Sequence, residues 1–98
     1  MIDPRLQKLA ASLINYSVEL KPGDKILIET TGQVTAFTQA LIREVYLCGG
    51  VPFLSLNDPV LEREILKKAD VNQVAAMARW DRARMEEMDA YLGIRAGD

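Results

Sequence analysis

The chain has 98 residues, which is enough for one domain with a modest hydrophobic core. Hydrophobic residues make up 49% of it and charged residues 27%, a balance that excludes an intrinsically disordered segment. The net charge of −2 argues against a nucleic-acid-binding protein, which would normally carry a basic face. No apolar run approaches the roughly 18 residues of a membrane span, and the first residues lack the order of a signal peptide. We therefore expect a cytoplasmic protein with neither nucleic acid nor membrane among its partners.

The first half of the sequence predicts a helix, a strand and a second helix. Asp3-Pro4 is a typical helix start, because the Asp side chain can accept hydrogen bonds from free amides and Pro has no amide to leave unpaired. An unbroken apolar run at 25–30 predicts a strand that is covered on both faces, as in parallel sheets. A second helix is predicted at 35–48 and ends at Gly49-Gly50, where one glycine can adopt the left-handed cap. The expected inner faces are Leu6, Leu9, Ala10, Leu13 and Ile14 in the first helix, and Phe37, Leu41, Val45 and Cys48 in the second.

The second half predicts a strand, two helices and a last strand. The strand at 51–56 contains Pro52, which lacks a ladder amide and so indicates a position at the sheet edge or strand start. A third helix is predicted at 60–69. Asp70 then offers a cap for a longer fourth helix, and the closing strand is predicted at 89–96.

Strands that are separated by helices indicate parallel pairing with right-handed crossovers. We therefore predict an α/β fold: a small three-layer domain in which a three-stranded parallel sheet is combined with about four helices, of the flavodoxin or Rossmann type. Only Gly97-Asp98 follows the last predicted strand, so we expect residues 1–98 to be one domain of a larger, two-domain enzyme.

Polar residues follow each predicted strand, at the edge of the sheet where parallel α/β proteins bind ligands. The candidates are Thr31, Asn57 and Arg95, which could form a small crevice for an anion with Arg95 as its positive charge. The structural alternative is that Thr35, Asn57 and Asp58 cap helices while Arg95 pairs with a carboxylate. The turn at 29–35 has one glycine where phosphate-binding turns need several, so it adds little support.

Self-contained catalysis is not expected of these residues. The chain has no histidine, so its serines lack the usual base and a metal would depend on carboxylates alone. Those carboxylates alternate with basic residues, which is typical of a solvated helix face with ion pairs. We predict no catalytic residue, no metal ligand and no cofactor in this chain.

The fourth helix carries a large aromatic residue, Trp80, among several methionines. Met77, Met85 and Met88 share one side, and their usual role is core filling; the alternative is an adaptable groove for a partner. Trp80 points elsewhere and is a candidate anchor for a second domain or subunit.

Four segments together resemble the N-terminal domain of the aminopeptidase T/aminopeptidase S family of metallopeptidases, over nearly the whole chain. The most specific are Leu13–Ile28, with its Tyr-Ser and Lys-Pro-Gly-Asp elements, and the DAYLGIRA segment Asp89–Ala96. The others are the segment 37–56 and the helix that contains Trp80.

This resemblance implies an exopeptidase that removes N-terminal amino acids from peptides with two divalent metal ions, of the zinc or cobalt type. In that family the metal ligands belong to a C-terminal catalytic domain, and none maps onto this sequence. The N-terminal domain shapes the active-site cavity and supports a homodimer, so this chain alone is expected to be inactive. Two alternatives stay open: a stand-alone module that binds a small anion or nucleotide at the strand ends, and an oligomerisation domain that uses Trp80.

Overall fold

The computed structural model describes residues 3–96 and contains every helix and strand that the sequence predicts, with ends that differ by a few residues. The first helix continues into a π-helical turn, η1, which the sequence did not predict. In chain order the elements are α1 (Pro4–Ser12), η1 (Leu13–Ser17), β1 (Lys25–Thr31), α2 (Thr35–Leu47), β2 (Val51–Asn57), α3 (Pro59–Leu66), α4 (Val71–Glu86) and β3 (Ala90–Arg95).

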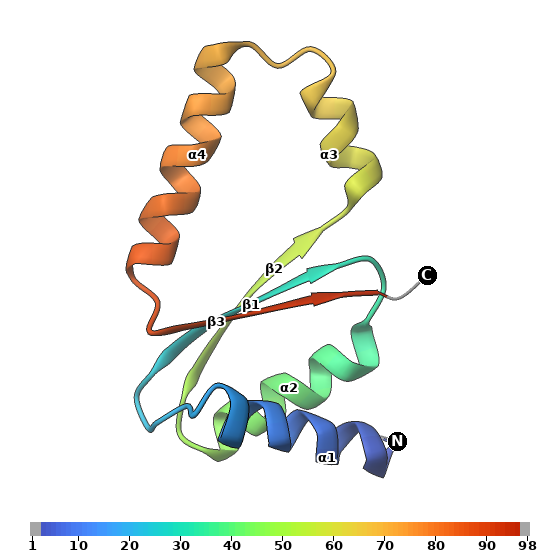
Figure 1. The fold of residues 1–98 in the computed structure, drawn as a ribbon, viewed down its shortest axis with the longest axis vertical. Helices are drawn as coiled ribbons and strands as arrows, with labels where there is room; N and C mark the ends of the chain where they lie inside the picture. The colour runs from blue at the N-terminus through green and yellow to red at the C-terminus, as the bar shows by residue number, and fades with distance from the viewer. Residues whose placement is uncertain (1–2, 97–98) are drawn as a thin grey trace.

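The three strands form one parallel sheet in the order β2-β1-β3, which confirms the predicted fold class (Figure 1). Ile28 in β1 is paired with Leu54 in β2 and with Leu92 in β3. β1 is therefore the central strand, and Pro52 lies on the edge strand β2, where a missing amide costs least.

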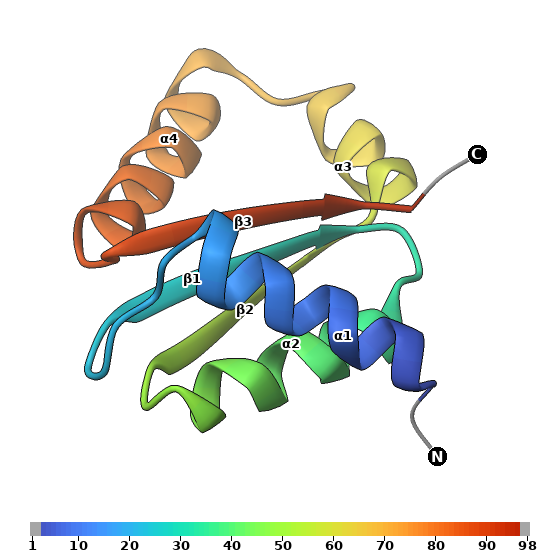
Figure 2. The same cartoon turned by 60° about the horizontal axis from the view of Figure 1, so that its bottom comes forward.

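The hydrophobic core lies between the sheet and the helices α1 and α2, which cover one of its faces (Figure 2). Ile26 and Ile28 of β1 meet Leu41 and Val45 of α2 in this core. Leu27 points to the opposite face but is also buried, as the unbroken apolar run predicts for a central strand. The remaining members of the core cluster are Ala10, Ile14, Leu20 and Ala40.

The caps expected from the sequence are present in the structure. The side chains of Asp3, Asp58 and Asp70 accept backbone hydrogen bonds at the starts of α1, α3 and α4. Gly49 ends α2 with φ +83°, and a side chain there would also lie 3.3 Å from Cβ of Pro22.

Two expectations about helix faces were wrong. Leu9 is exposed, because α1 and η1 turn Ala10 and Ile14 into the core and leave Leu9 at the margin of the apolar stripe. In α4, Met85 is exposed instead of filling a core. Neither α3 nor α4 has a buried residue, since the two helices form an arch that stands away from the second face of the sheet (Figure 1). None of the helices among residues 3–96 is long and apolar enough to cross a membrane.

Candidate functional site at the carboxyl ends of the strands

The three polar residues predicted to share one edge of the sheet lie in a single row. Thr31, Asn57 and Arg95 are the last residues of β1, β2 and β3, and the register pairs Thr31 with both of the others. Residues paired across parallel strands point to the same face, here the face that α3 and α4 overlook. The three side chains line one hollow of about 360 Å³, which we call the rim hollow.

Glu29 is the polar centre of the rim hollow, two residues before Thr31 on the same face of β1. Asn57 donates from Nδ2 to Oε2 of Glu29 at 2.8 Å, and the hydroxyl of Tyr91 donates to Oε1 at 2.5 Å. These hydrogen bonds, first the one from Tyr91 and then the one from Asn57, lower the pKa of Glu29. The Glu29 side chain is therefore an ionised carboxylate held by donors from both neighbouring strands.

Tyr91 reaches Glu29 across a glycine. Glu29 is paired with Gly93, so Tyr91 contacts it diagonally from two residues earlier in β3. A Cβ at Gly93 would lie 3.0 Å from the Tyr91 hydroxyl oxygen, so the missing side chain leaves room for the ring. The hydrogen bond to Glu29 raises the pKa of Tyr91, and burial adds to this effect.

The helix-capping alternative holds for one residue of the rim. Asp58 caps α3 by accepting from the amide of Val60 at 2.9 Å. The residue before α2 is Val34, not Thr35, and no side chain caps that helix. Asn57 bonds Glu29 instead of a helix amide, and Arg95 has no ion-pair partner within residues 3–96.

Glu62, in the first turn of α3, adds a second carboxylate to the rim hollow. Sequence reasoning did not place Glu29, Glu62 or Tyr91 at the site. A period of two along the strands could have found two of them, because Glu29 and Thr31, like Tyr91 and Arg95, alternate onto one face. Glu62 could not be placed, since the direction in which α3 leaves the sheet is not encoded in a strand pattern.

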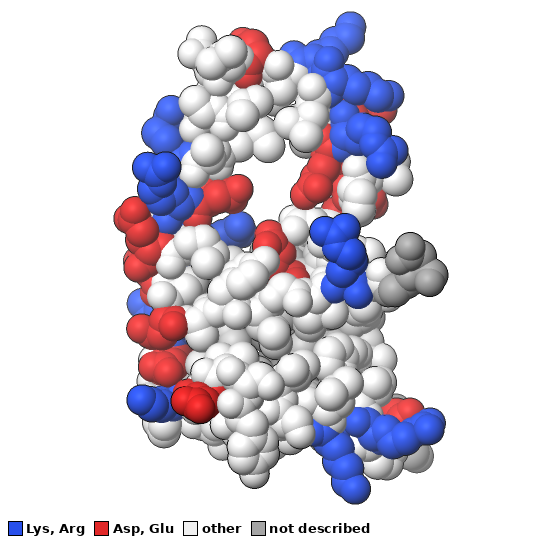
Figure 3. Space-filling view, viewed as in Figure 1, with Lys and Arg blue, Asp and Glu red and all other residues white. Residues whose placement is uncertain are grey.

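A second hollow of about 260 Å³ continues toward α4 and shares Glu29, Asn57 and Glu62 with the first. Its α4 wall includes Trp80, 68% exposed, and Arg84, whose guanidinium pairs with Asp81 at 3.2 Å. Figure 3 shows acidic side chains on both sides of the opening between the sheet and the arch of α3 and α4.

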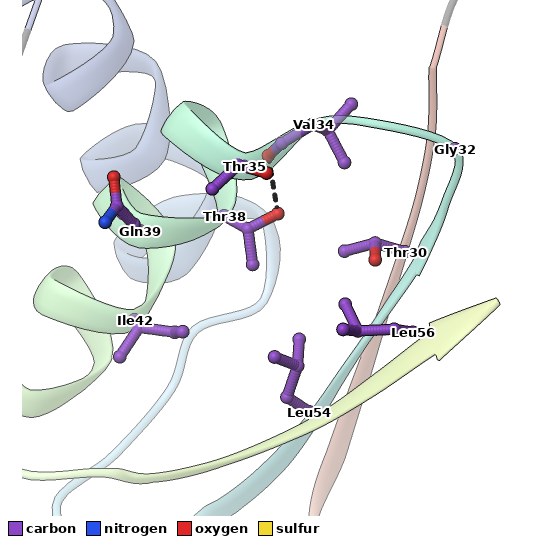
Figure 4. Close-up of a pocket in the computed structure, with 9 residues that line it drawn as sticks. All are labelled: Thr30, Gly32, Val34, Thr35, Thr38, Gln39, Ile42, Leu54 and Leu56. Atoms are coloured by element: carbon purple, nitrogen blue, oxygen red, sulfur yellow. Dashed lines mark hydrogen bonds between the residues drawn. The ribbon is translucent and has the colours of Figure 1, made fainter. Parts of the chain in front are cut away.

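A third hollow, of about 190 Å³, lies between α2 and the edge strand β2 (Figure 4). Its walls are largely apolar, with Ile42 facing Leu54 and Leu56. The hydroxyl of Thr38 donates to the carbonyl oxygen of Val34 at 2.7 Å, so its hydrogen is not available to a ligand. No charged side chain lines this hollow among the described residues, so it offers little polar chemistry.

The described residues do not fit a catalytic metal centre. Within residues 3–96 no three side chains of the His, Cys, Asp or Glu type come together in a way that could hold a metal ion. The chain as a whole contains no histidine. Zinc sites with only carboxylate ligands are uncommon, and the carboxylates of the described residues are not grouped to form one.

The fold and the row of polar strand ends define a parallel α/β domain with a ligand-sized hollow at the usual edge. Over residues 2–98 the chain matches the family described as thermophilic metalloprotease (M29), and it belongs to this family. This confirms the family resemblance seen in the sequence. No curated protein matches the chain.

Among solved structures, the fold is similar to that of wild-type AmpT from Thermus thermophilus, with a TM-score of 0.73 and 21% sequence identity. The match covers 95% of this chain and 25% of the AmpT chain. The chain therefore spans about a quarter of the length of that protein, and the likeness establishes the shared fold.

Proposed function

We propose that residues 1–98 are the N-terminal α/β domain of a metal-dependent aminopeptidase that hydrolyses N-terminal residues from peptides. The match of residues 2–98 to the M29 metalloprotease family carries this proposal. The fold shared with about a quarter of AmpT supports a domain that works as one part of a longer polypeptide. A cytoplasmic location stays part of the proposal.

In this proposal the 98-residue chain has a structural role and no hydrolytic activity of its own. The lack of histidine and of any metal-capable group within residues 3–96 supports a division of labour in which a C-terminal catalytic domain binds two divalent ions, zinc or cobalt. The domain described here would shape the cavity that receives the peptide.

An activity assay tests this division directly. The 98-residue chain and the full reading frame are each incubated with leucine p-nitroanilide in the presence of zinc or cobalt. We expect release of p-nitroaniline from the full-length protein only, and loss of that activity when a chelator removes the metal. An inactive full-length protein under every metal condition contradicts the aminopeptidase assignment. Activity in the 98-residue chain contradicts the division of labour.

We also propose that Trp80 contributes to a contact with a second subunit. Its exposure on a helix without buried residues supports this, because large exposed aromatic side chains are common binding anchors. Sedimentation of Trp80→Ala should then show a weaker dimer than the wild type. Tyr46→Ala is the matched control, since Tyr46 is 66% exposed but lies on α2, on the other side of the sheet. A wild-type monomer, or equal weakening by both variants, contradicts the proposal.

The anion or nucleotide alternative is less well supported by the geometry. Glu29 and Glu62 line the same hollow as Arg95, so a phosphate there would face two carboxylates and one guanidinium.

A further inference from the structure

We propose that the rim hollow binds a small zwitterion whose ammonium group contacts Glu29 and Glu62 and whose carboxylate contacts Arg95. This goes beyond the proposed function, because it gives the 98-residue chain a ligand of its own that requires neither a metal nor hydrolysis.

The charges around the hollow determine the type of ligand. Two carboxylates, from Glu29 and Glu62, and one guanidinium, from Arg95, line it. A simple anion would be repelled by the carboxylates, and a simple cation would be repelled by Arg95. A ligand with both charges can satisfy all three groups.

Glu29 is well prepared to accept an ammonium group. Each of its oxygens already accepts one hydrogen bond, from Tyr91 or from Asn57, and a carboxylate has about four acceptor sites. Both oxygens thus keep a free lone pair, while the two donors fix the orientation of the side chain before the ligand arrives. The lowered pKa of Glu29 keeps it ionised at neutral pH.

Arg95 and Glu62 are free to take part. Neither side chain has a hydrogen-bond or ion-pair partner within residues 3–96. Arg84 lines the neighbouring hollow, which shares Glu29, and its guanidinium pairs with Asp81 at 3.2 Å. Its charge also helps to lower the pKa of Glu29. The volume of about 360 Å³ lies within the range of roughly 300–1,000 Å³ that is usual for small-molecule pockets.

The test is a titration of the ¹⁵N-labelled 98-residue chain, followed by NMR, with glycylglycine as the zwitterion. Two blocked analogues remove one charge each: N-acetylglycylglycine lacks the ammonium group, and glycylglycinamide lacks the carboxylate. We expect shifts at the amides of Thr31, Gly93 and Arg95 with glycylglycine, and affinity at least about tenfold weaker for each analogue, as expected for loss of a charge-assisted hydrogen bond. Inorganic phosphate is the fourth probe and should bind more weakly than glycylglycine.

Variants separate this site from general surface charge. Glu62→Gln and Arg95→Gln should each weaken glycylglycine binding at least about fivefold, by loss of one charged contact. Glu64→Gln is the matched control, because Glu64 lies on the same helix but pairs with Lys67 and does not line the hollow. It should leave binding unchanged.

Two results overturn the proposal: no shift with glycylglycine, or equal binding of the blocked analogues. If glycylglycine does not bind but phosphate binds in a way that depends on Arg95, the anion site predicted from the sequence is restored. If a variant fails to fold, the ligand series on the wild type decides alone. The assay of the full reading frame is a separate measurement, so failure of one proposal is distinguishable from failure of the other.

Discussion

Tyr91 and Glu29 form a diagonal link between the two strands β3 and β1, in which the tyrosine hydroxyl donates to the carboxylate at 2.5 Å. The ring lies over Gly93, so one strand supplies both the donor and the space that the donor needs. Asn57 completes the arrangement from β2. All three strands therefore meet at one carboxylate near the edge where the sheet ends.

The Tyr91–Glu29 link predicts a change in stability at both ends of the pH scale. Because the folded state lowers the pKa of Glu29 below its ordinary value of 4.5, its contribution is complete above that pH and is lost as the pH falls through the folded pKa. The pKa of Tyr91 is raised above 10.0, so its contribution is complete below that pH and is lost as the pH rises through the folded pKa.

Tyr91→Phe keeps the ring over Gly93 and removes the hydrogen-bond donor. It should therefore make the free energy of unfolding depend less steeply on pH in both the acid limb and the alkaline limb of the profile. Urea unfolding at about pH 3 to 6 and about pH 9 to 11 measures this, and we expect a loss of roughly 0.5–1 kcal/mol at neutral pH. An acid limb as steep as that of the wild type would show that Tyr91 does not set the pKa of Glu29.

Gly93→Ala should weaken the Tyr91–Glu29 hydrogen bond, because the new side chain would lie against the tyrosine ring. The new Cβ would lie 3.0 Å from the hydroxyl oxygen of Tyr91 and 3.3 Å from Cε2, so the ring must move and its bond to Glu29 weakens. We expect a loss of roughly 1 kcal/mol in the wild-type background. In a Tyr91→Ala background the same change should be neutral or slightly stabilising, because alanine suits a strand better than glycine does. Equal costs in the two backgrounds, measured by urea unfolding, would mean that Gly93 serves some other purpose.

Local sequence signals were sufficient for most of the fold. The Asp-Pro helix starts, the apolar run of β1 and the left-handed Gly49 depend on neighbouring residues, and the structure contains each of them. The row of Thr31, Asn57 and Arg95 follows from parallel pairing alone, since parallel strands end at the same edge.

The parts that could not be predicted depend on tertiary geometry. The sequence of α4 shows apolar residues that suggest a core, but whether they are buried depends on where the arch of α3 and α4 stands. The link between Tyr91 and Glu29 joins two residues that are 62 positions apart in the sequence, so it depends on the register between their strands. Placing Glu62 at the hollow requires knowing the direction in which α3 leaves the sheet.

The core between the sheet and α2 predicts a large difference between two leucines of the same helix. Leu41 is completely buried, whereas Leu47 is 77% exposed. Leu41→Ala should cost about 2–5 kcal/mol, from lost burial and the cavity that remains, and Leu47→Ala less than about 0.5 kcal/mol. Chemical unfolding of the two variants measures both values. Similar losses of stability in the two variants would show that the core does not lie between the sheet and the Leu41 face of α2.

A polar contact between the two helices of the covered layer gives a last prediction. Gln7 of α1 donates from Nε2 to Oε1 of Glu44 at 2.6 Å, and Glu44 is buried on α2. Gln7→Ala leaves this carboxylate without its side-chain donor, so we expect a loss of about 1–3 kcal/mol in the free energy of unfolding. Ser12→Ala, at an exposed position of α1 that does not line the hollow beside Gln7 and Glu44, is the control and should change little. Because the penalty arises from the isolated carboxylate, the double variant Gln7→Ala/Glu44→Ala should be more stable than the sum of the single changes predicts. Strictly additive losses would show that Gln7 stabilises α1 by packing and not through Glu44.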